Sequence, residues 1–312
     1  METILAGILS TAILAGGVLA LGALGEVMAE RVGVVNLGVE GLMAMGAVTG
    51  IAVVLAVPNP WVGLLAATLV GMLLSAIFAF ATVVLKANQI LCGLALTLIG
   101  GGLSATLGRP YSSTPAPATF EPVIIPGLSD LPIVGRGIFS QNILIYLIYL
   151  VLPLLLYFIM FKTRHGLNLR AVGENPSAAD AAGIPVTRIR FLYVTLGGAL
   201  AGMAGGYLTL AYIPSWSDGV VAGRGWIAVA LVIFAGYRPI SAVLAALFFG
   251  VITALGFVGQ ARNWPIPAPF LSMLPYLGTI GLMIVPVLAW RKLRRWMAAP
   301  DALGEPYYRD VR

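Results

Sequence analysis

Long apolar segments separated by short polar ones form the dominant pattern of this chain. We expect apolar spans at about residues 3–25, 32–57, 61–85, 90–107, 142–161, 191–212, 225–237, 240–258 and 271–290. Most of them reach the roughly 20 residues that an α-helix needs to cross about 30 Å of hydrocarbon. The segment 225–237 is shorter, which predicts a tilted, broken or re-entrant helix. The pattern predicts an all-α polytopic membrane protein, a single domain over residues 1–312 with about nine transmembrane helices.

The composition supports a membrane protein surrounded by lipid. Of the 312 residues 60% are hydrophobic and only 10% are charged, which no soluble globular domain matches. The net charge of +6 would indicate nucleic acid in a soluble chain, but here the basic residues lie at the ends of spans. Membrane topology explains them, so we expect no nucleic-acid partner. The single Cys92 excludes an intrachain disulfide.

Three polar segments interrupt or follow the spans. Residues 109–140 are rich in proline and predict an ordered surface loop, residues 162–190 form a basic loop, and residues 291–312 form a basic tail. Placing the last two in the cytoplasm puts fourteen of the 18 Lys and Arg residues there. The positive-inside rule then predicts an outside N-terminus, an extracytoplasmic 109–140 loop and a cytoplasmic C-terminus.

The basic loop contains a short helix with a signal at each end. Asn175 can cap it, Pro176 suits the first helical position, residues 177–182 propagate it, and Gly183 with Pro185 stops it. Two turns of helix are marginal alone in water. A solvated connecting loop and a helix docked into a soluble partner both fit this pattern.

Glu40 is the acid expected deepest in the membrane. Counted along one helix from Arg31, it would lie roughly 13 Å deep, with Asn36 one turn earlier as a possible partner. A carboxylate at such a depth is expensive and marks a candidate functional site. The alternative is a hydrogen-bonded Glu that only holds helices together.

Glycine is abundant, with 38 residues and clusters at 100–102, 197–198 and 202–206. Close helix packing explains such clusters better than direct substrate contact. Gly223, Gly225 and Trp226 open the short seventh segment much as residues 33–41 open the second. The two segments are expected to run in opposite directions, which indicates an inverted repeat with a substrate path at its interface.

Enzymatic sites are not expected. His165 is the only histidine, so neither a His-based metal site nor a Ser-His pair can form. No Gly-rich phosphate loop ending in Gly-Lys-Ser/Thr occurs. We therefore predict that the chain is no enzyme, holds no cofactor and takes its energy from a partner.

Three segments carry a family resemblance: GEVMAERVGVVNLGVEGLMAMGAVTG at 25–50, RAVGENPSAADAAGIPV at 170–186 and GRGWIAVALVIFAGYRP at 223–239. They resemble ABC-importer permeases of the branched-chain amino acid and ribose permease superfamily, in its nucleoside-type branch associated with basic membrane lipoproteins. The resemblance extends over nearly the whole chain. It implies a permease subunit in a bacterial inner membrane that moves nucleosides by alternating access.

The resemblance also implies partners and sites. The partners would be a second permease, related or identical, a cytoplasmic ABC ATPase that uses ATP and Mg²⁺, and a lipid-anchored extracytoplasmic substrate-binding protein. The short helix would be a coupling helix that docks on the ATPase through Glu174, Asn175, Pro176, Ser177, Asp180 and Gly183. The translocation path would lie near Asn36, Glu40, Gly225 and Trp226.

Other functions remain open. A ribose or branched-chain amino acid permease would keep the architecture and change the substrate. A secondary transporter would use Glu40 as its proton-coupling acid but would leave the capped short helix unexplained. A substrate-gated channel would allow downhill flux with no ATPase partner.

Overall fold

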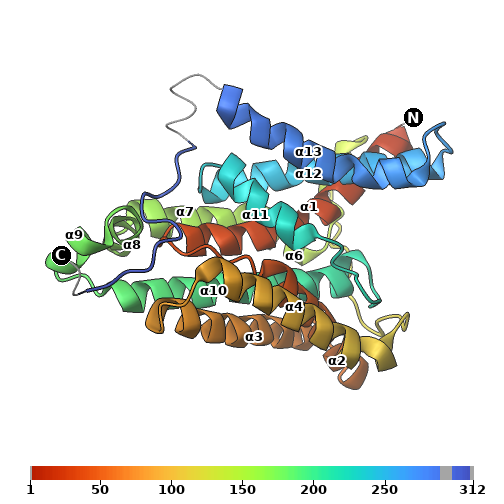
Figure 1. The fold of residues 1–312 in the computed structure, drawn as a ribbon. Helices are drawn as coiled ribbons and strands as arrows, with labels where there is room; N and C mark the ends of the chain where they lie inside the picture. The colour runs from red at the N-terminus through yellow and green to blue at the C-terminus, as the bar shows by residue number, and fades with distance from the viewer. Residues whose placement is uncertain (1, 289–296, 310–312) are drawn as a thin grey trace.

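The computed structural model describes residues 2–288 and 297–309, which form helices joined by short connections (Figure 1). The longest helices are α1 (Glu2–Glu30), α2 (Val39–Ala56), α3 (Pro60–Ala79), α4 (Gln89–Gly108), α10 (Val186–Tyr207), α12 (Pro239–Ala261) and α13 (Ala268–Leu288). Shorter ones are α5 (Val134–Ile138), α6 (Ile143–Tyr146), α7 (Leu152–Lys162), α8 (Arg164–Glu174), α9 (Pro176–Ala181) and α11 (Arg224–Phe234). Single π-helical turns extend α3, join α6 to α7 and extend α10 at Phe80–Val84, Leu147–Val151 and Leu208–Tyr212.

Seven helical segments of the described part are long and apolar enough to cross a membrane: Leu5–Glu30, Val39–Ala56, Pro60–Val84, Gln89–Tyr111, Ile143–Lys162, Val186–Tyr212 and Pro239–Ala261. The short seventh segment is α11, with 11 residues. The expected ninth span begins as α13, and its end at 289–290 lies outside the described residues, as does the first part of the basic tail. The all-α multi-pass fold is confirmed, and the count of nine stays a prediction.

Helices α1 and α10 run through the middle of the molecule (Figure 1). The apolar window of α10 is 72% buried and that of α1 is 61% buried, against 22% for α4. A Cβ added to Gly25 would lie 2.4 Å from the carbonyl oxygen of Gly197, and one on Gly46 would lie 2.1 Å from that of Gly202. The helix backbones therefore touch at these glycines, which supports the packing interpretation.

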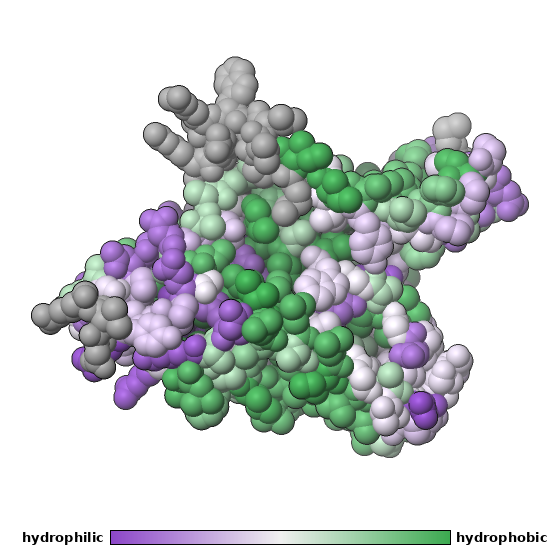
Figure 2. Space-filling view, viewed as in Figure 1, coloured by the Kyte–Doolittle hydropathy of each residue, from purple (hydrophilic) through white to green (hydrophobic). Residues whose placement is uncertain are grey.

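Helices α3 and α4 present apolar side chains outward. Leu73 and Ile77 of α3 are 62% and 59% exposed, and Leu98 of α4 is 76% exposed. Figure 2 shows apolar residues over the middle of the visible face and hydrophilic ones gathered at the end that holds α8 and α9. Such a band fits a surface covered by lipid or by another membrane subunit.

A non-helical stretch, residues 31–38, separates α1 from α2. α1 continues past the expected end at residue 25 and stops in a Schellman motif: Gly33 has φ +84°, its N–H donates to Glu30, and the Val34 N–H donates to Ala29. α2 begins at Val39 instead of residue 32. The depth expected for Glu40 from one continuous helix is therefore wrong, because Gly33 ends the helix before it.

The proline-rich segment 109–140 is an ordered surface loop, as expected. Its Ser113 N–H donates to the carbonyl of Trp216 at 2.8 Å, and its Ala116 N–H donates to that of Pro214 at 2.9 Å. Trp216 is only 2% exposed beneath it. The loop is thus fastened to the connection that leads into α11.

The basic loop contains the short helix that its end signals predict. α9 follows Asn175, whose side-chain oxygen accepts from the Ala178 N–H at 2.9 Å, and Pro176 takes the first position. Gly183, with φ +80°, ends it and donates to Asp180. The local prediction is confirmed.

A second helix in this loop, α8, was missed. Thr163 caps it by accepting from the Gly166 N–H at 3.0 Å, and Leu169 and Val172 are fully buried beneath it. The Thr163 cap and the apolar residues three positions apart were the available signals. The short α9 is therefore the second arm of a two-helix unit.

Residues 297–309 fold back over this α8–α9 end (Figure 1). The Ala302 N–H donates to Gly173 at 3.0 Å, and the Gly304 N–H donates to Gly33 at 3.1 Å. Arg190 of α10 donates to the carbonyl of Glu305 at 2.8 Å. We call residues 297–309 the tail strap, because it connects α8, the α1–α2 break and α10.

Candidate functional site: the junction of α2 and α11

The N-terminal ends of α2 and α11 meet at Glu40. Its Oε1 accepts the N–H of Gly223 and its Oε2 accepts the N–H of Gly225, both at 2.7 Å. Glu40 lies in the first turn of α2. Its carboxylate therefore sits at the positive ends of two helix dipoles and satisfies two backbone donors that have no partner inside α11.

Gly225 makes this close approach possible. A Cβ at Gly225 would lie 2.6 Å from both the Cα and the backbone nitrogen of Glu40. Gly223 precedes α11 in the left-handed conformation, with φ +76°. Trp226 follows in the first turn of α11 and is 38% exposed. The structure thus brings together three of the four predicted pathway residues, Glu40, Gly225 and Trp226.

Asn36 lies apart from this contact. It is 2% exposed, its N–H donates to Oε1 of Glu26 at 2.8 Å, and its side-chain oxygen accepts from the Gly38 N–H at 2.9 Å. The expected pairing of Asn36 with Glu40 is wrong, because the residues between them are not one turn of helix.

Buried side chains satisfy the irregular backbone of residues 31–38. Gln89 accepts from the Val35 N–H at 2.9 Å, and Thr97 donates to the carbonyl of Leu37 at 2.8 Å. With Glu26, these residues replace the hydrogen bonds that a helix would provide, which non-helical backbone needs at membrane depth. We had not singled them out, although Glu26 follows a long apolar run and was a usable signal.

Arg31 connects this break to the α8–α9 end. Its Nε donates to the carbonyl of Tyr237 at 2.8 Å, and its guanidinium lies 5.5 Å from the centre of the Phe161 ring. Its Nη1 lies 3.9 Å from Oε1 of Glu174. Burial lowers the pKa of Arg31, and the charge of Glu174 opposes that shift.

The two acids predicted to contact a partner already have partners in the tail strap. Oε2 of Glu174 accepts from the Asp301 N–H at 3.3 Å, and Oδ2 of Asp180 lies 3.3 Å from Nε of Arg309. Small residues form the exposed face around α9, namely Ser177, Ala178, Ala181 and Ala182. That face remains available to another molecule.

Comparison with known proteins identifies the chain by similarity. It is 36% identical to the guanosine ABC transporter permease protein NupQ of Bacillus subtilis, over 94% of both chains. It is 37% identical to the nucleoside ABC transporter permease protein NupC of Lactococcus lactis, over 82% of this chain and 84% of that one. A Haloferax volcanii protein named for glucose transport, TsgC13, is 37% identical over 98% of each. No solved structure matches the chain.

A family model described as "Branched-chain amino acid transport system / permease component" matches residues 8–283. These relatives are transport permeases that act within ABC systems of several subunits. The match includes every helix from α1 to α12, the Glu40 junction and the α8–α9 unit. The chain therefore belongs to the permease family of branched-chain amino acid type ABC transporters.

Proposed function

We propose that this chain is the permease subunit of an ATP-driven importer of nucleosides. The observation that supports it most directly is the identity of 36% with a guanosine permease over 94% of both chains. A second relative named for nucleosides, at 37% identity, agrees. The glucose-named relative at 37% makes a sugar importer the second candidate.

The partners follow from this proposal. A second permease subunit would cover part of the apolar outer surface, and a lipid-anchored binding protein would deliver substrate to the face with residues 109–140. Cytoplasmic ABC ATPases, using ATP and Mg²⁺, would dock at the α8–α9 end. The N-terminus would then lie outside and the C-terminus in the cytoplasm of a bacterial inner membrane, in agreement with the distribution of Lys and Arg.

The proposed mechanism is alternating access. ATP binding and hydrolysis would move α9, which acts as the coupling helix, and the contact of Glu174 with Arg31 would pass this motion to the α1–α2 break. The break and the Glu40 junction are non-helical or helix-terminal elements, which absorb backbone rotation more readily than helix interiors. Residues 1–312 act as one domain in this scheme.

Uptake of radiolabelled adenosine, guanosine and uridine tests the proposal, in cells with and without the gene. Unlabelled glucose, ribose and leucine serve as competitors, and an uncoupler is added while ATP is maintained. We expect uptake that requires the gene, survives the uncoupler and is unaffected by the three competitors. Inhibition by a sugar or by leucine would replace the substrate, and loss with the uncoupler alone would indicate a secondary transporter.

The coupling helix has its own test. Ala181→Arg and Ala182→Arg place a long charged side chain on the exposed face at the end of α9, so we expect the ATPase to be lost from the purified complex. Ala261→Arg, an exposed position at the end of α12, is the matched control and should retain it. Retention of the ATPase by all three variants would show that α9 is not its docking element.

A further inference from the structure

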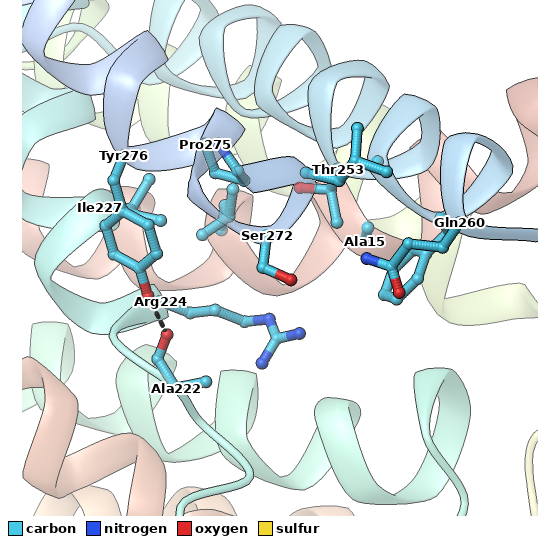
Figure 3. Close-up of a pocket in the computed structure, with 13 residues that line it drawn as sticks. Ala15, Ala222, Arg224, Ile227, Thr253, Gln260, Ser272, Pro275 and Tyr276 are labelled. Atoms are coloured by element: carbon cyan, nitrogen blue, oxygen red, sulfur yellow. Dashed lines mark hydrogen bonds between the residues drawn. The ribbon is translucent and has the colours of Figure 1, made fainter. Parts of the chain in front are cut away.

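A cavity of about 280 Å³ lies between α1, α11, α12 and α13, next to the start of α11. Figure 3 shows that Arg224, Thr253, Gln260 and Ser272 point into one space, with the ring of Tyr276 along one side. None of these five residues was among the predicted pathway positions. The cavity is close to the lower end of the range for small-molecule sites, roughly 300 Å³.

Arg224 is held in place by its own helix start. Its Nη1 donates to the carbonyls of Val220 at 2.8 Å and Val221 at 3.0 Å. Its guanidinium also lies 6.0 Å from the centre of the Tyr212 ring. A guanidinium has five N–H donors, and these contacts use only part of them. Arg224 can therefore donate to a ligand without giving up its position.

Three uncharged polar groups face the same space. Ser272 donates to Ala268 at 3.1 Å and Thr253 donates to Phe249 at 2.9 Å, so both hydroxyl oxygens keep lone pairs to accept a ligand's hydrogen bond. Within the described part of the chain, the Gln260 carboxamide has no hydrogen-bond partner. It can both donate to and accept from a ligand.

Aromatic rings complete the lining. The hydroxyl of Tyr276 donates to the carbonyl of Ala222, which fixes the ring, and 43% of Tyr276 is exposed. Phe257 also lines the cavity and is 46% exposed. Aromatic side chains stack on nucleobases regardless of their sequence-specific edges.

These groups define a chemical class of ligand. The described residues that line the cavity include no Asp or Glu, so an ammonium group would find no anionic partner there. A carboxamide beside a guanidinium matches an aromatic edge with adjacent donors and acceptors, and hydroxyl oxygens match ribose hydroxyls. Polar groups inside an otherwise apolar helix assembly are also expensive to keep unless they have a function.

We propose that this cavity binds the incoming nucleoside, with the base stacked on Tyr276 and its edge read by Gln260 and Arg224. Ser272 and Thr253 accept from the ribose hydroxyls. The inference rests on the proposed function and adds a substrate site to it. In the proposed orientation the cavity lies in the outer half of the membrane, at the C-terminal end of α12 and the start of α13, before the Glu40 junction.

Photolabelling locates the site directly. The purified complex is irradiated with 8-azidoadenosine, and the labelled peptides are identified by mass spectrometry with and without excess guanosine. We expect guanosine-sensitive label on the segments that contain Tyr276 and Gln260. Label confined to other helices, or label that guanosine does not displace, would overturn the assignment. Phospholipid bound at Arg224 in place of nucleoside, seen by native mass spectrometry, would do so as well.

Transport kinetics separate this inference from the proposed function. Gln260→Leu and Ser272→Ala should each raise KM for guanosine roughly tenfold with kcat little changed, because each removes a hydrogen bond made on binding. Ala261→Leu, outside the lining, should leave KM unchanged. Wild-type guanosine uptake with unaltered KM in both cavity variants would refute the site alone. Absence of nucleoside uptake in the wild type would refute the proposed function and the site together.

Discussion

Gly205→Ala is expected to leave little folded permease in the membrane. A Cβ at Gly205 would lie 1.9 Å from the carbonyl oxygen of Met43 and 2.7 Å from the nitrogen of Ala47. Both are backbone atoms of α2, so α10 and α2 would have to separate along their contact. Overpacking costs about 1–3 kcal/mol in cores that can adjust, and we expect the upper end here. Thermal unfolding of the detergent-purified protein, followed by size-exclusion chromatography, measures the loss.

Gly102→Ala provides the matched control for this change. A Cβ at Gly102 of α4 meets nothing within 4 Å. Replacing a helical glycine by alanine then stabilises a helix by roughly 0.5–1 kcal/mol. The same substitution should therefore have opposite effects on the two helices. Equal unfolding temperatures for the two variants would contradict the described α2–α10 contact.

Glu40→Ala is expected to reduce uptake at least about tenfold without removing the protein from the membrane. The backbone N–H groups of Gly223 and Gly225 would lose their acceptor, and each buried donor left without a partner costs about 1–3 kcal/mol. The start of α11 would then no longer be fixed against α2. Uptake and expression, measured in parallel, separate this effect from misfolding.

Glu40→Gln distinguishes a helix-capping role from proton coupling. The amide keeps one of the two acceptor oxygens, so a capping role predicts activity between those of wild type and Glu40→Ala. A proton-coupled carrier would lose uptake as fully with Gln as with Ala. Glu121→Ala, at an exposed position of the proline-rich loop, should behave as wild type.

The sequence could predict elements whose signals are local. Asn175, Pro176 and Gly183 specify the start and end of α9 through caps that involve only neighbouring residues, and the structure agrees with them. The apolar runs likewise predict the membrane helices, because each must be about as long as the hydrocarbon is thick. The likeness between the openings of the second and seventh segments correctly indicated two regions that meet.

The sequence could not reveal features that depend on distant partners. Gly33 was visible, but a glycine ends a helix only where the freed backbone groups find acceptors and donors, here from Glu26, Gln89 and Thr97. Two of those residues are more than fifty positions from the groups they bind. The cavity lined by Arg224 and Gln260 needs four helices in place before its polar groups share one space.

The tail strap has a consequence for how the protein is made. Glu174, Asp180 and Gly33 are synthesised long before Asp301, Arg309 and Gly304, with which they pair. The α8–α9 face can therefore take its final form only after α13 has been inserted and the strap has left the ribosome. Until then Glu174 and Asp180 lack these partners, so the order of synthesis itself delays the moment at which an ATPase meets the finished surface.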